Sequence, residues 1–437
     1  MSDRNSMPQI LATGLGAALI VFAASYGLSA PFDPETYGSW VAFIGIVSVP
    51  SLLVAGSLWR YRHPAVLAGL GQPWRGLAFL ALTMAGMALG AAFLYFGPGG
   101  GAGITPFLIN AAILSIVSTF WVMGLWECWP LSRWIANPVL LGISAWAIAY
   151  LLADLAFHFL FNFAEARHAP FYRPALDPGG LLPSWDVLVF AVTTSAVIVA
   201  WEKLLGLWPL HGPMAHRHPL WRGLIASAVV LTASGLWMGA LCLIFGMDVV
   251  DFMLRGPIAL LFGIFFATNL TQSRLFAGLA QPGRGTRLVI LAYPLGFVLE
   301  ELYRIAAPAV MGVPLPPGGP RYELELWVAT ALLAVTFPLI VVVTGYFDFW
   351  PLKRARTEAD PHYLLRLALG ACGGFCASSV AASFNSRPTI LTHSINARAA
   401  GGRSPGARIM APTGVCRFPS FTGKSLSRPW STSSRAT

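Results

Sequence analysis

Long apolar segments follow one another along most of the chain, and this succession constrains the fold more than any other feature of the sequence. A helix that crosses a bilayer needs roughly 20 largely apolar residues. Segments of about that length occur eleven times, separated by short polar stretches rich in Gly, Pro and Arg. The pattern therefore predicts a chain that crosses a membrane many times.

We predict an all-α fold, a polytopic integral membrane protein of about eleven transmembrane helices, or twelve in an intact form. The first apolar run resembles a signal peptide only superficially, because ten further segments follow it, and we interpret it as a span. The expected spans are 9–29, 38–59, 75–96, 104–126, 137–162, 185–207, 221–247, 256–279, 286–308, 324–349 and 363–382.

Composition excludes an ordinary soluble protein. Hydrophobic residues make up 56% of the chain and charged residues 11%, whereas soluble domains have roughly 45–50% and about 25%. So few charges cannot cover a water-facing surface of this size, and the lipid bilayer is the expected partner. The net charge of +10 does not indicate a nucleic-acid partner, because the first 380 residues hold 20 basic and 18 acidic groups.

The end of the chain differs in composition from the rest. We expect a transmembrane bundle over residues 1–380 and a basic, disordered tail over 381–437, which has eight basic residues and no acid. One hypothesis is a genuine tail. The other, which we favour, is a reading-frame change after about residue 376 that replaced the end of the eleventh span and a twelfth span. Translation of the neighbouring frames tests it.

The basic residues beside the spans predict the orientation. Thirteen lie in the turns after spans two, four, six, eight and ten, and five lie in the opposite loops. Lys and Arg are enriched on the cytoplasmic side of membrane proteins. We therefore expect a cell (inner) membrane protein with a cytoplasmic N-terminus.

A polar stretch of ten residues occurs twice. LAGLGQPWRG at 67–76 returns as FAGLAQPGRG at 276–285, and both lie in turns on the expected cytoplasmic side. Pro suits the first turn of a helix and Trp suits the headgroup level. The pattern predicts a helical hairpin used five times, a common way to build membrane bundles. Related pieces are PLWRG at 219–223 and WPL at 129–131, 208–210 and 350–352.

Each of these turns is expected to act as a membrane-interface anchor. Aromatic rings suit the headgroup level and Arg suits the region just outside it. The anchors that we predict are Trp129, Trp208, Trp350, Arg75, Arg222 and Arg284.

Ionisable residues near the membrane are functional candidates, because each costs a few kcal/mol in lipid. The acids Glu127, Glu202 and Asp348 precede the WPL pieces at the cytoplasmic ends of spans four, six and ten. They are candidates for a gate or for proton-linked carboxylates. The alternative, which their repetition favours, is an ion pair of each acid with a nearby Arg or Lys that holds the hairpins together.

A second candidate group occupies the end of the fifth span. Asp154, His158, Asn162 and Glu165 are spaced by four, four and three residues, which places them on one helical face. An Asp and a His one turn apart can share a proton or bind a cation, and His titrates near neutral pH. The alternative is a polar stripe that faces other helices, with Glu165 at the surface.

Glu300 and Glu301 of the ninth span form a third group. Adjacent residues cannot share a helix face, so one of the two is expected at the surface. Asp248 and Asp251 are expected at the outer end of span seven. If the helices surround one cavity, these acids give it a mouth that attracts cations.

Together these features favour a transporter or permease-like protein of unknown substrate, cation- or proton-linked. The alternatives are a non-catalytic membrane partner or assembly subunit and an integral-membrane enzyme or redox subunit. The sequence has no HExxH, GxSxG, Walker A or nucleotide-binding fingerprint. We predict neither a catalytic residue nor a metal ligand, and the substrate, cofactor and oligomeric state stay open.

Overall fold

A computed structural model describes residues 7–169, 171–210, 218–319 and 321–353. The expected eleventh span and the basic tail lie outside these residues, so both stay predictions. The described chain is mainly helical, and nine of its helices are long and apolar enough to cross a membrane. Its strands are the two-residue β1 (Phe161–Asn162) and β2 (Leu182–Pro183), which pair in parallel.

Five segments form the interior of the bundle, and we call them the inner segments. Between 61% and 78% of each spanning window is buried. Each is named below after one of its helices. The α3 segment joins α2 (Pro34–Thr36), η1 (Tyr37–Val41), α3 (Ala42–Leu53) and η2 (Val54–Leu58); the α6 segment joins α6 (Pro106–Thr119) and η3 (Phe120–Leu125); the α9 segment joins α9 (Ser184–Val199) and η5 (Ala200–Leu204); the α13 segment joins α12 (Val249–Met253), η7 (Leu254–Ile258) and α13 (Ala259–Leu270); and the α16 segment joins α15 (Glu323–Ala329), η8 (Thr330–Thr336), α16 (Phe337–Val341) and η9 (Val342–Tyr346).

Five further helices, which we call the outer helices, alternate with the inner segments and run in the opposite direction to them. The four that fall among the nine candidate spans have only 11% to 39% of their windows buried. α14 is the longest, and it carries more charge than the others. The outer helices are α1 (Met7–Ser29), α5 (Trp74–Phe96), α8 (Pro138–Leu160), α11 (Pro219–Met238) continued by η6 (Gly239–Ile244), and α14 (Gly283–Met311); the short helices α4 (Ala65–Ala68), α7 (Leu131–Trp134) and η4 (Ala164–Ala166) lie in connections.

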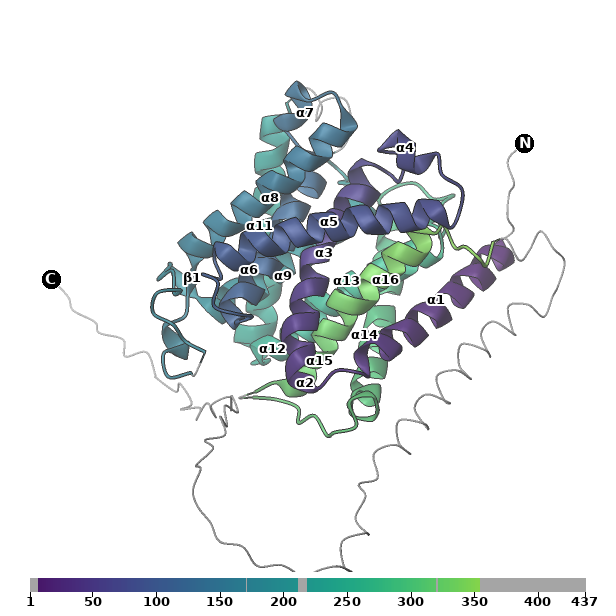
Figure 1. Ribbon diagram of the computed structural model, residues 1–437. Coiled ribbons are helices and arrows are strands. Elements are labelled where there is room, and N and C mark those ends of the chain that lie inside the picture. Colours follow the sequence, from purple (N-terminus) through teal and green to yellow (C-terminus); the bar gives the residue numbers. More distant parts are fainter. Residues whose placement is uncertain (1–6, 170, 211–217, 320, 354–437) are drawn as a thin grey trace, which may run out of the picture.

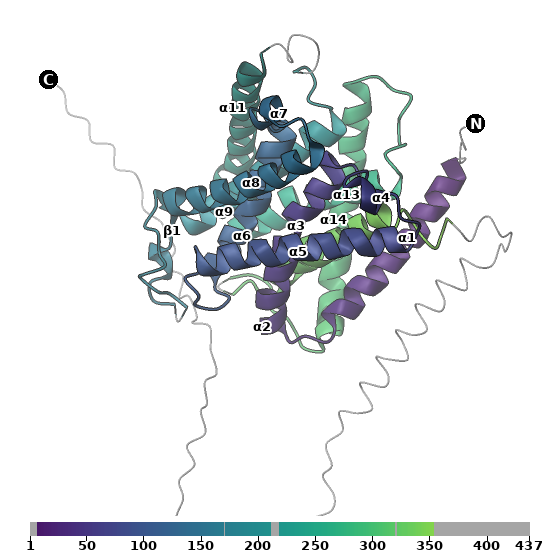
Figure 2. The same ribbon diagram turned by 45° about the horizontal axis from the view of Figure 1, so that its top comes forward.

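The inner segments close into a ring. Neighbours pack in the order α3, α6, α9, α13, α16 and back to α3. The outer helices cover this ring, and Figure 2 shows α5 and α8 in front of α3, α6 and α9. In Figure 1 the short helices α4 and α7 mark one end of the bundle at the top, and α2 marks the other at the bottom.

The polar stretches at the α4 and α7 end share one backbone geometry, and we call them the corners. Each begins where an inner segment ends, at residues 59, 126, 205, 271 and 347, and its second and third residues have left-handed backbone. In four corners the first N–H bonds the carbonyl five residues earlier and the third N–H bonds the carbonyl six earlier. These wide bonds use carbonyls that a helix end leaves unpaired, as a lipid environment requires.

Outer helices begin directly on corners of other hairpins, and glycine allows the approach. A Cβ at Gly76 of α5 would lie 2.6 Å from the Phe347 ring, and one at Gly285 of α14 would lie 2.5 Å from Leu205. Phe347 and Leu205 are each the first residue of a corner. The glycine that follows Arg75 or Arg284 therefore leaves the space that the corner side chain occupies. We call this contact a seat.

Three more contacts complete this arrangement. Gly223 of α11 packs on Trp126, and the Trp59 indole N–H donates to the carbonyl of Pro138 at the start of α8 (2.9 Å). α1 packs on the end of α13, where a Cβ at Gly14 would lie 2.4 Å from a backbone oxygen. Every outer helix thus packs on the end of an inner segment from another hairpin. The pairs are α5 on the α16 segment, α8 on the α3 segment, α11 on the α6 segment, α14 on the α9 segment and α1 on the α13 segment.

The two copies of the ten-residue turn make the same three hydrogen bonds. Gln72 donates to the carbonyl of Tyr346 (2.8 Å) and accepts from the N–H of Gly76, and Arg75 donates to the carbonyl of Tyr61. In the second copy Gln281 donates to Leu204 (2.7 Å) and accepts from Gly285, and Arg284 donates to Ser273. Tyr346 and Leu204 are equivalent, because each is the last residue of an inner segment.

The beginning of the eighth span differs from the prediction. It starts at Val249 rather than at 256, because the Asp248 carboxylate accepts hydrogen bonds from the N–H groups of Val250 and Asp251 and so caps a helix there. Asp248 and Asp251 therefore belong to the start of the eighth span and not to the end of the seventh.

The crossing of α13 and α14 gives a testable prediction. A Cβ at Gly296 would lie 1.8 Å from the carbonyl oxygen of Ala259, and one at Gly263 would lie 1.9 Å from that of Ala292. Gly296→Ala must separate the two helices, which costs about 1–3 kcal/mol. We expect a lower unfolding temperature in detergent. Gly283→Ala in the same helix, with no neighbour within 4 Å, should leave it unchanged or raise it; equal shifts would contradict the crossing.

Candidate functional site

The three corner acids each lie in an ion pair. Glu127 lies 2.7 Å from Arg222, and Arg222 is only 7% exposed. The second acid, Glu202, pairs with Lys203 (2.8 Å), and Asp348 pairs with Lys353 (2.5 Å). The Glu127 pair links the corner after η3 to α11, whereas the other two pairs are local. Only the Glu127 pair joins two hairpins, which is what the structural alternative expects of all three pairs. A role of these acids in transport stays a prediction.

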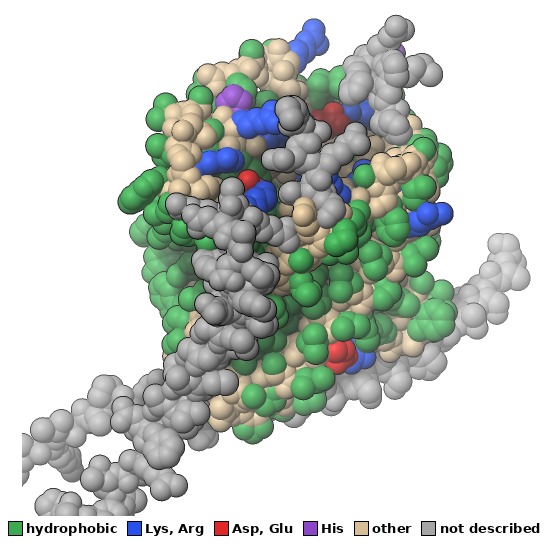
Figure 3. Space-filling view, turned by 90° about the vertical axis from the view of Figure 1, so that its right-hand side faces the viewer, with side chains coloured by type: hydrophobic (Ala, Val, Ile, Leu, Met, Phe, Trp, Pro, Cys, Tyr) green, Lys and Arg blue, Asp and Glu red, His purple; other side chains and the backbone are tan. Residues whose placement is uncertain are grey.

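The expected interface anchors occupy mixed environments. Trp208 is exposed, whereas Trp129 and Trp350 are half-buried and pack against Trp126 and Phe347. Arg222 differs from the expected headgroup-facing residue, because it is buried against Glu127. Figure 3 shows hydrophobic side chains over the middle of one face and Lys and Arg gathered towards its upper, corner end.

Burial also changes the acidity of two corner residues. It raises the pKa of Tyr61 to about 12 and that of the Cys128 thiol to about 11, with the charge of Glu127 as a second cause for Cys128. Both groups are therefore protonated at neutral pH. Cys128 is a buried thiol rather than a reactive thiolate.

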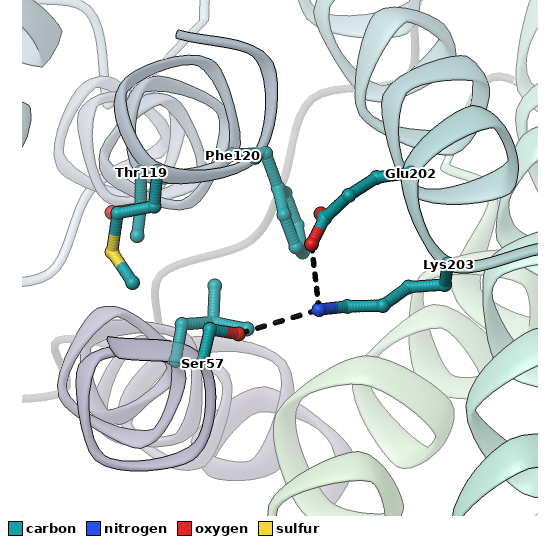
Figure 4. Close-up of a pocket in the computed structure, with 8 residues that line it drawn as sticks. Ser57, Thr119, Phe120, Glu202 and Lys203 are labelled. Carbon is teal, nitrogen blue, oxygen red and sulfur yellow. Dashed lines mark hydrogen bonds and ion pairs between the residues drawn. The ribbon is translucent and has the colours of Figure 1, made fainter. Parts of the chain in front are cut away.

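A small pocket opens at the corner end of the inner ring. It is shallow, with room for about one water molecule, and three inner segments contribute to it. Figure 4 shows Lys203 reaching across it, with Nζ 2.8 Å from the Glu202 carboxylate and 3.4 Å from the Ser57 hydroxyl. Gly124 lets Glu202 approach, since a Cβ there would lie 2.7 Å from Oε2. The lining residues are Leu53, Ser57, Thr119, Phe120, Met123, Gly124, Glu202 and Lys203.

Beside this pocket, three aromatic side chains from three inner segments contact one another. Phe120 of η3 and Phe265 of α13 are stacked with centroids 6.4 Å apart, although their segments are not ring neighbours. Phe265 also contacts Phe337 of α16, at 4.3 Å. Phe120 also lines the pocket, so this set of three rings borders it.

The Asp154–His158 pair lies on the outward side of α8. His158 Nδ1 is 3.4 Å from the Asp154 carboxylate and 2.9 Å from the Asp154 carbonyl oxygen. The side chains are 34% and 56% exposed. Large apolar neighbours on α8, Leu155 and Phe159, are also exposed. The pair therefore faces outward.

The predicted helical face does not extend beyond His158. α8 ends at Leu160, so the expectation that Asn162 and Glu165 continue it is wrong. Asn162 lies in β1, where its amide donates to the carbonyl of Gly180 (3.1 Å) and its oxygen accepts from Ala164. Strand pairing with Leu182–Pro183 replaces the next helical turn. Glu165 is exposed, as the surface alternative expects.

Glu300 and Glu301 lie in different environments, as adjacent residues of one helix must. Glu300 is fully buried, and Glu301 is 33% exposed. Arg304, one turn further along α14, donates from Nη2 (2.8 Å) and Nε (3.1 Å) to Glu300 Oε1. Its Nη1 donates to Glu325 of α15 (3.2 Å), which is 2% exposed. One guanidinium thus serves two buried carboxylates and links an outer helix to an inner segment.

Beside this cluster three hydroxyl groups connect three spans. The Tyr303 hydroxyl lies 3.1 Å from Ser25 of α1 and 2.6 Å from Thr336 of η8, and Ser25 and Thr336 are 2.8 Å apart. All three are buried. They satisfy one another's hydrogen bonds in an apolar interior, which makes them a structural link.

A second set of polar residues lies at the α2 end of the ring, opposite the corners. Tyr322, before α15, donates to the Asp248 carboxylate before α12 (2.9 Å) and lies against the Trp185 ring of α9. Burial and the hydrogen bond to Asp248 raise the pKa of Tyr322 to about 12. It therefore stays a donor at neutral pH and joins three inner segments at this end.

Two predicted groups are not brought together. α8 packs mainly on α6, whereas α14 packs mainly on α13 and α15. Among the residues that the structure describes, no ion pair joins Asp154 or His158 to Glu300 or Glu301. Sequence reasoning missed Arg304, Glu325 and Lys203 as site residues. The four-residue spacing of Glu300 and Arg304 is a visible signal of an ion pair, but nothing in the sequence links Glu325 to them.

Within the described residues, no group of three His, Cys, Asp or Glu side chains could hold a metal ion. No family model matches the chain, and neither a curated protein nor a solved structure matches it. The activity therefore has to follow from the chain's own geometry.

Arg304→Gln tests the buried cluster. The substitution leaves the Glu300 and Glu325 carboxylates without their cation, and breaking a buried pair costs about 3–5 kcal/mol. We expect a large fall in the unfolding temperature measured in detergent micelles.

Arg321→Gln is the matched control. Arg321 is 49% exposed and pairs with Glu323, and such pairs contribute about 0–1 kcal/mol. A shift for Arg304→Gln as small as that of the control would show that the buried cluster does not stabilise the fold.

Proposed function

We propose that this multi-pass membrane protein is a transporter or permease-like protein, with its passage along the axis of the inner ring. The observation that carries the proposal is the closed ring of inner segments with the Lys203–Glu202 pocket at one mouth. Transporters commonly hold a solute between the helices of one bundle, at the interface of internal repeats. The substrate stays open.

The corner contacts support a fivefold internal repeat of an inner-segment and outer-helix hairpin. The left-handed residues recur in all five corners, and each outer helix starts on the equivalent inner segment. Repeats around a central site are common in transporters. We place the corner end at the cytoplasmic face of a cell (inner) membrane, because the basic residues gather there.

The Phe120, Phe265 and Phe337 rings are the proposed gate. They fill the centre of the ring beside the pocket, so a solute in the pocket passes only if these rings move. Aromatic constrictions of this kind control access in channels.

Lys203→Met tests the pocket. In proteoliposomes, wild-type protein should transport at least one member of a panel of inorganic ions and small polar solutes. The substitution removes a charged hydrogen-bond donor, worth 1.5–3 kcal/mol, so the flux should fall roughly ten- to hundredfold.

Lys353→Met removes the same charge from another ion pair at the same end of the bundle, but Lys353 does not line the pocket. It should leave the flux unchanged. Equal flux for wild type, Lys203→Met and empty liposomes would refute the proposal. Asp154→Asn in the same assay decides whether the outward-facing pair takes part.

Phe265→Ala tests the gate. Without this ring the contacts with Phe120 and Phe337 are lost, and we expect a raised passive leak of small ions from loaded liposomes. The substitution also costs about 3–5 kcal/mol of stability. Phe79→Ala controls for that cost, because Phe79 is equally buried but packs against Tyr61 and Tyr346 at a corner. A leak in both variants, or in neither, would contradict the gate.

A further inference from the structure

One oxygen of the buried cluster has no partner. Glu300 Oε1 accepts both hydrogen bonds from Arg304, whereas Oε2 is enclosed and has no donor within reach. The Glu300 side chain has no exposed area. Buried polar atoms are almost always hydrogen-bonded, and a charged oxygen without a donor costs the most. This atom therefore indicates an occupant.

The charges of the cluster identify the occupant. Glu300, Glu325 and Arg304 together carry −1 when both acids are ionised, and they are neutral with one added proton. Glu325 has its own donors, Arg304 and the N–H of Gly318. The excess negative charge therefore falls on Glu300. A proton needs no cavity, whereas any larger cation would have to displace the enclosing side chains.

The groups around Glu300 leave this balance in place. Glu301 lies 3.9 Å from Arg304 and 3.6 Å from Arg255 of η7. Adding Glu301 and Arg255 to the sum adds one negative and one positive charge, so the total stays at −1. From α1 and α14, Tyr26 and Tyr303 contribute neutral rings in contact with each other. Arg304 keeps its bond to Glu325 when Glu300 is neutral, so protonation does not leave the guanidinium without a counter-ion.

We propose that Glu300 is a proton-binding site, and that the proton it exchanges drives the transport. The step adds a proton from water to the Oε2 atom and breaks no covalent bond. Glu301, adjacent in sequence, is partly exposed and lies within ion-pair distance of Arg304. The coupling rests on the proposed transport function, whereas the proton binding itself does not.

Infrared spectroscopy of the full-length protein in lipid nanodiscs tests the binding. A protonated carboxyl has a C=O stretch that an ionised one lacks, so wild-type protein should show such a band that titrates with pH. Glu300→Gln keeps an oxygen for Arg304 and should abolish the titrating band. Glu301→Gln, the matched change at the neighbouring residue, should retain it. The absence of a titrating band in the wild type, or its persistence in Glu300→Gln, overturns the proposal.

Glu300→Asp keeps the assay decisive if the Gln variant does not fold. The shorter acid should displace the band, and an unchanged band overturns the assignment. In liposomes, a pH gradient with the acidic side inside should accelerate solute flux through wild-type protein and not through Glu300→Gln. A titrating band without any flux supports the proton site and refutes transport. Solute flux that does not depend on the pH gradient, together with the absence of a titrating carboxyl band, refutes the proton site but not the transport function.

Discussion

The close seating of outer helices on the corners is the contact on which the rest of the structure depends. Lipid tails are as apolar as the helix surfaces, so packing between spans gains little from the hydrophobic effect and depends on close van der Waals contact. Gly76, Gly223 and Gly285 supply that contact, because each accepts a large corner side chain where a Cβ would collide. Each seat joins helices of different hairpins, and five such joints hold the ring closed.

Three buried threonines of the ring have their hydroxyl groups satisfied within their own helices. Thr119, Thr193 and Thr194 are buried, and their hydroxyls donate to carbonyls of their own helices. They therefore offer no continuous polar path along the axis. Charged side chains lie at the two ends of the ring, and Phe120 and Phe265 contact each other across it. Under the proposed transport function, this closed arrangement has to open for a solute to cross.

Much of this arrangement follows from local sequence. Hydropathy predicts most of the spans, and the two copies of the ten-residue turn mark where α5 and α14 begin, because both signals lie within one segment of the sequence. The end of α8 at Leu160 could not be predicted, because Phe161–Phe163 continues the apolar run and the strand partner lies some twenty residues later. The pairing of Arg304 with Glu325 was also hidden, because it joins two spans through a fold that hydropathy does not describe.

One helix connects the proposed proton site to the proposed gate. α14 begins on the corner after η5, crosses α13 through the Gly263–Gly296 contact, and further along carries Arg304, which is bound to α15. Gly263 is two residues from Phe265, the ring at the centre of the bundle. In the proposed transport cycle, protonation of Glu300 weakens its bond to Arg304. Because α14 packs backbone to backbone on α13 at Gly263 and Gly296, the proposal requires that a displacement of α14 reaches Phe265 through this contact.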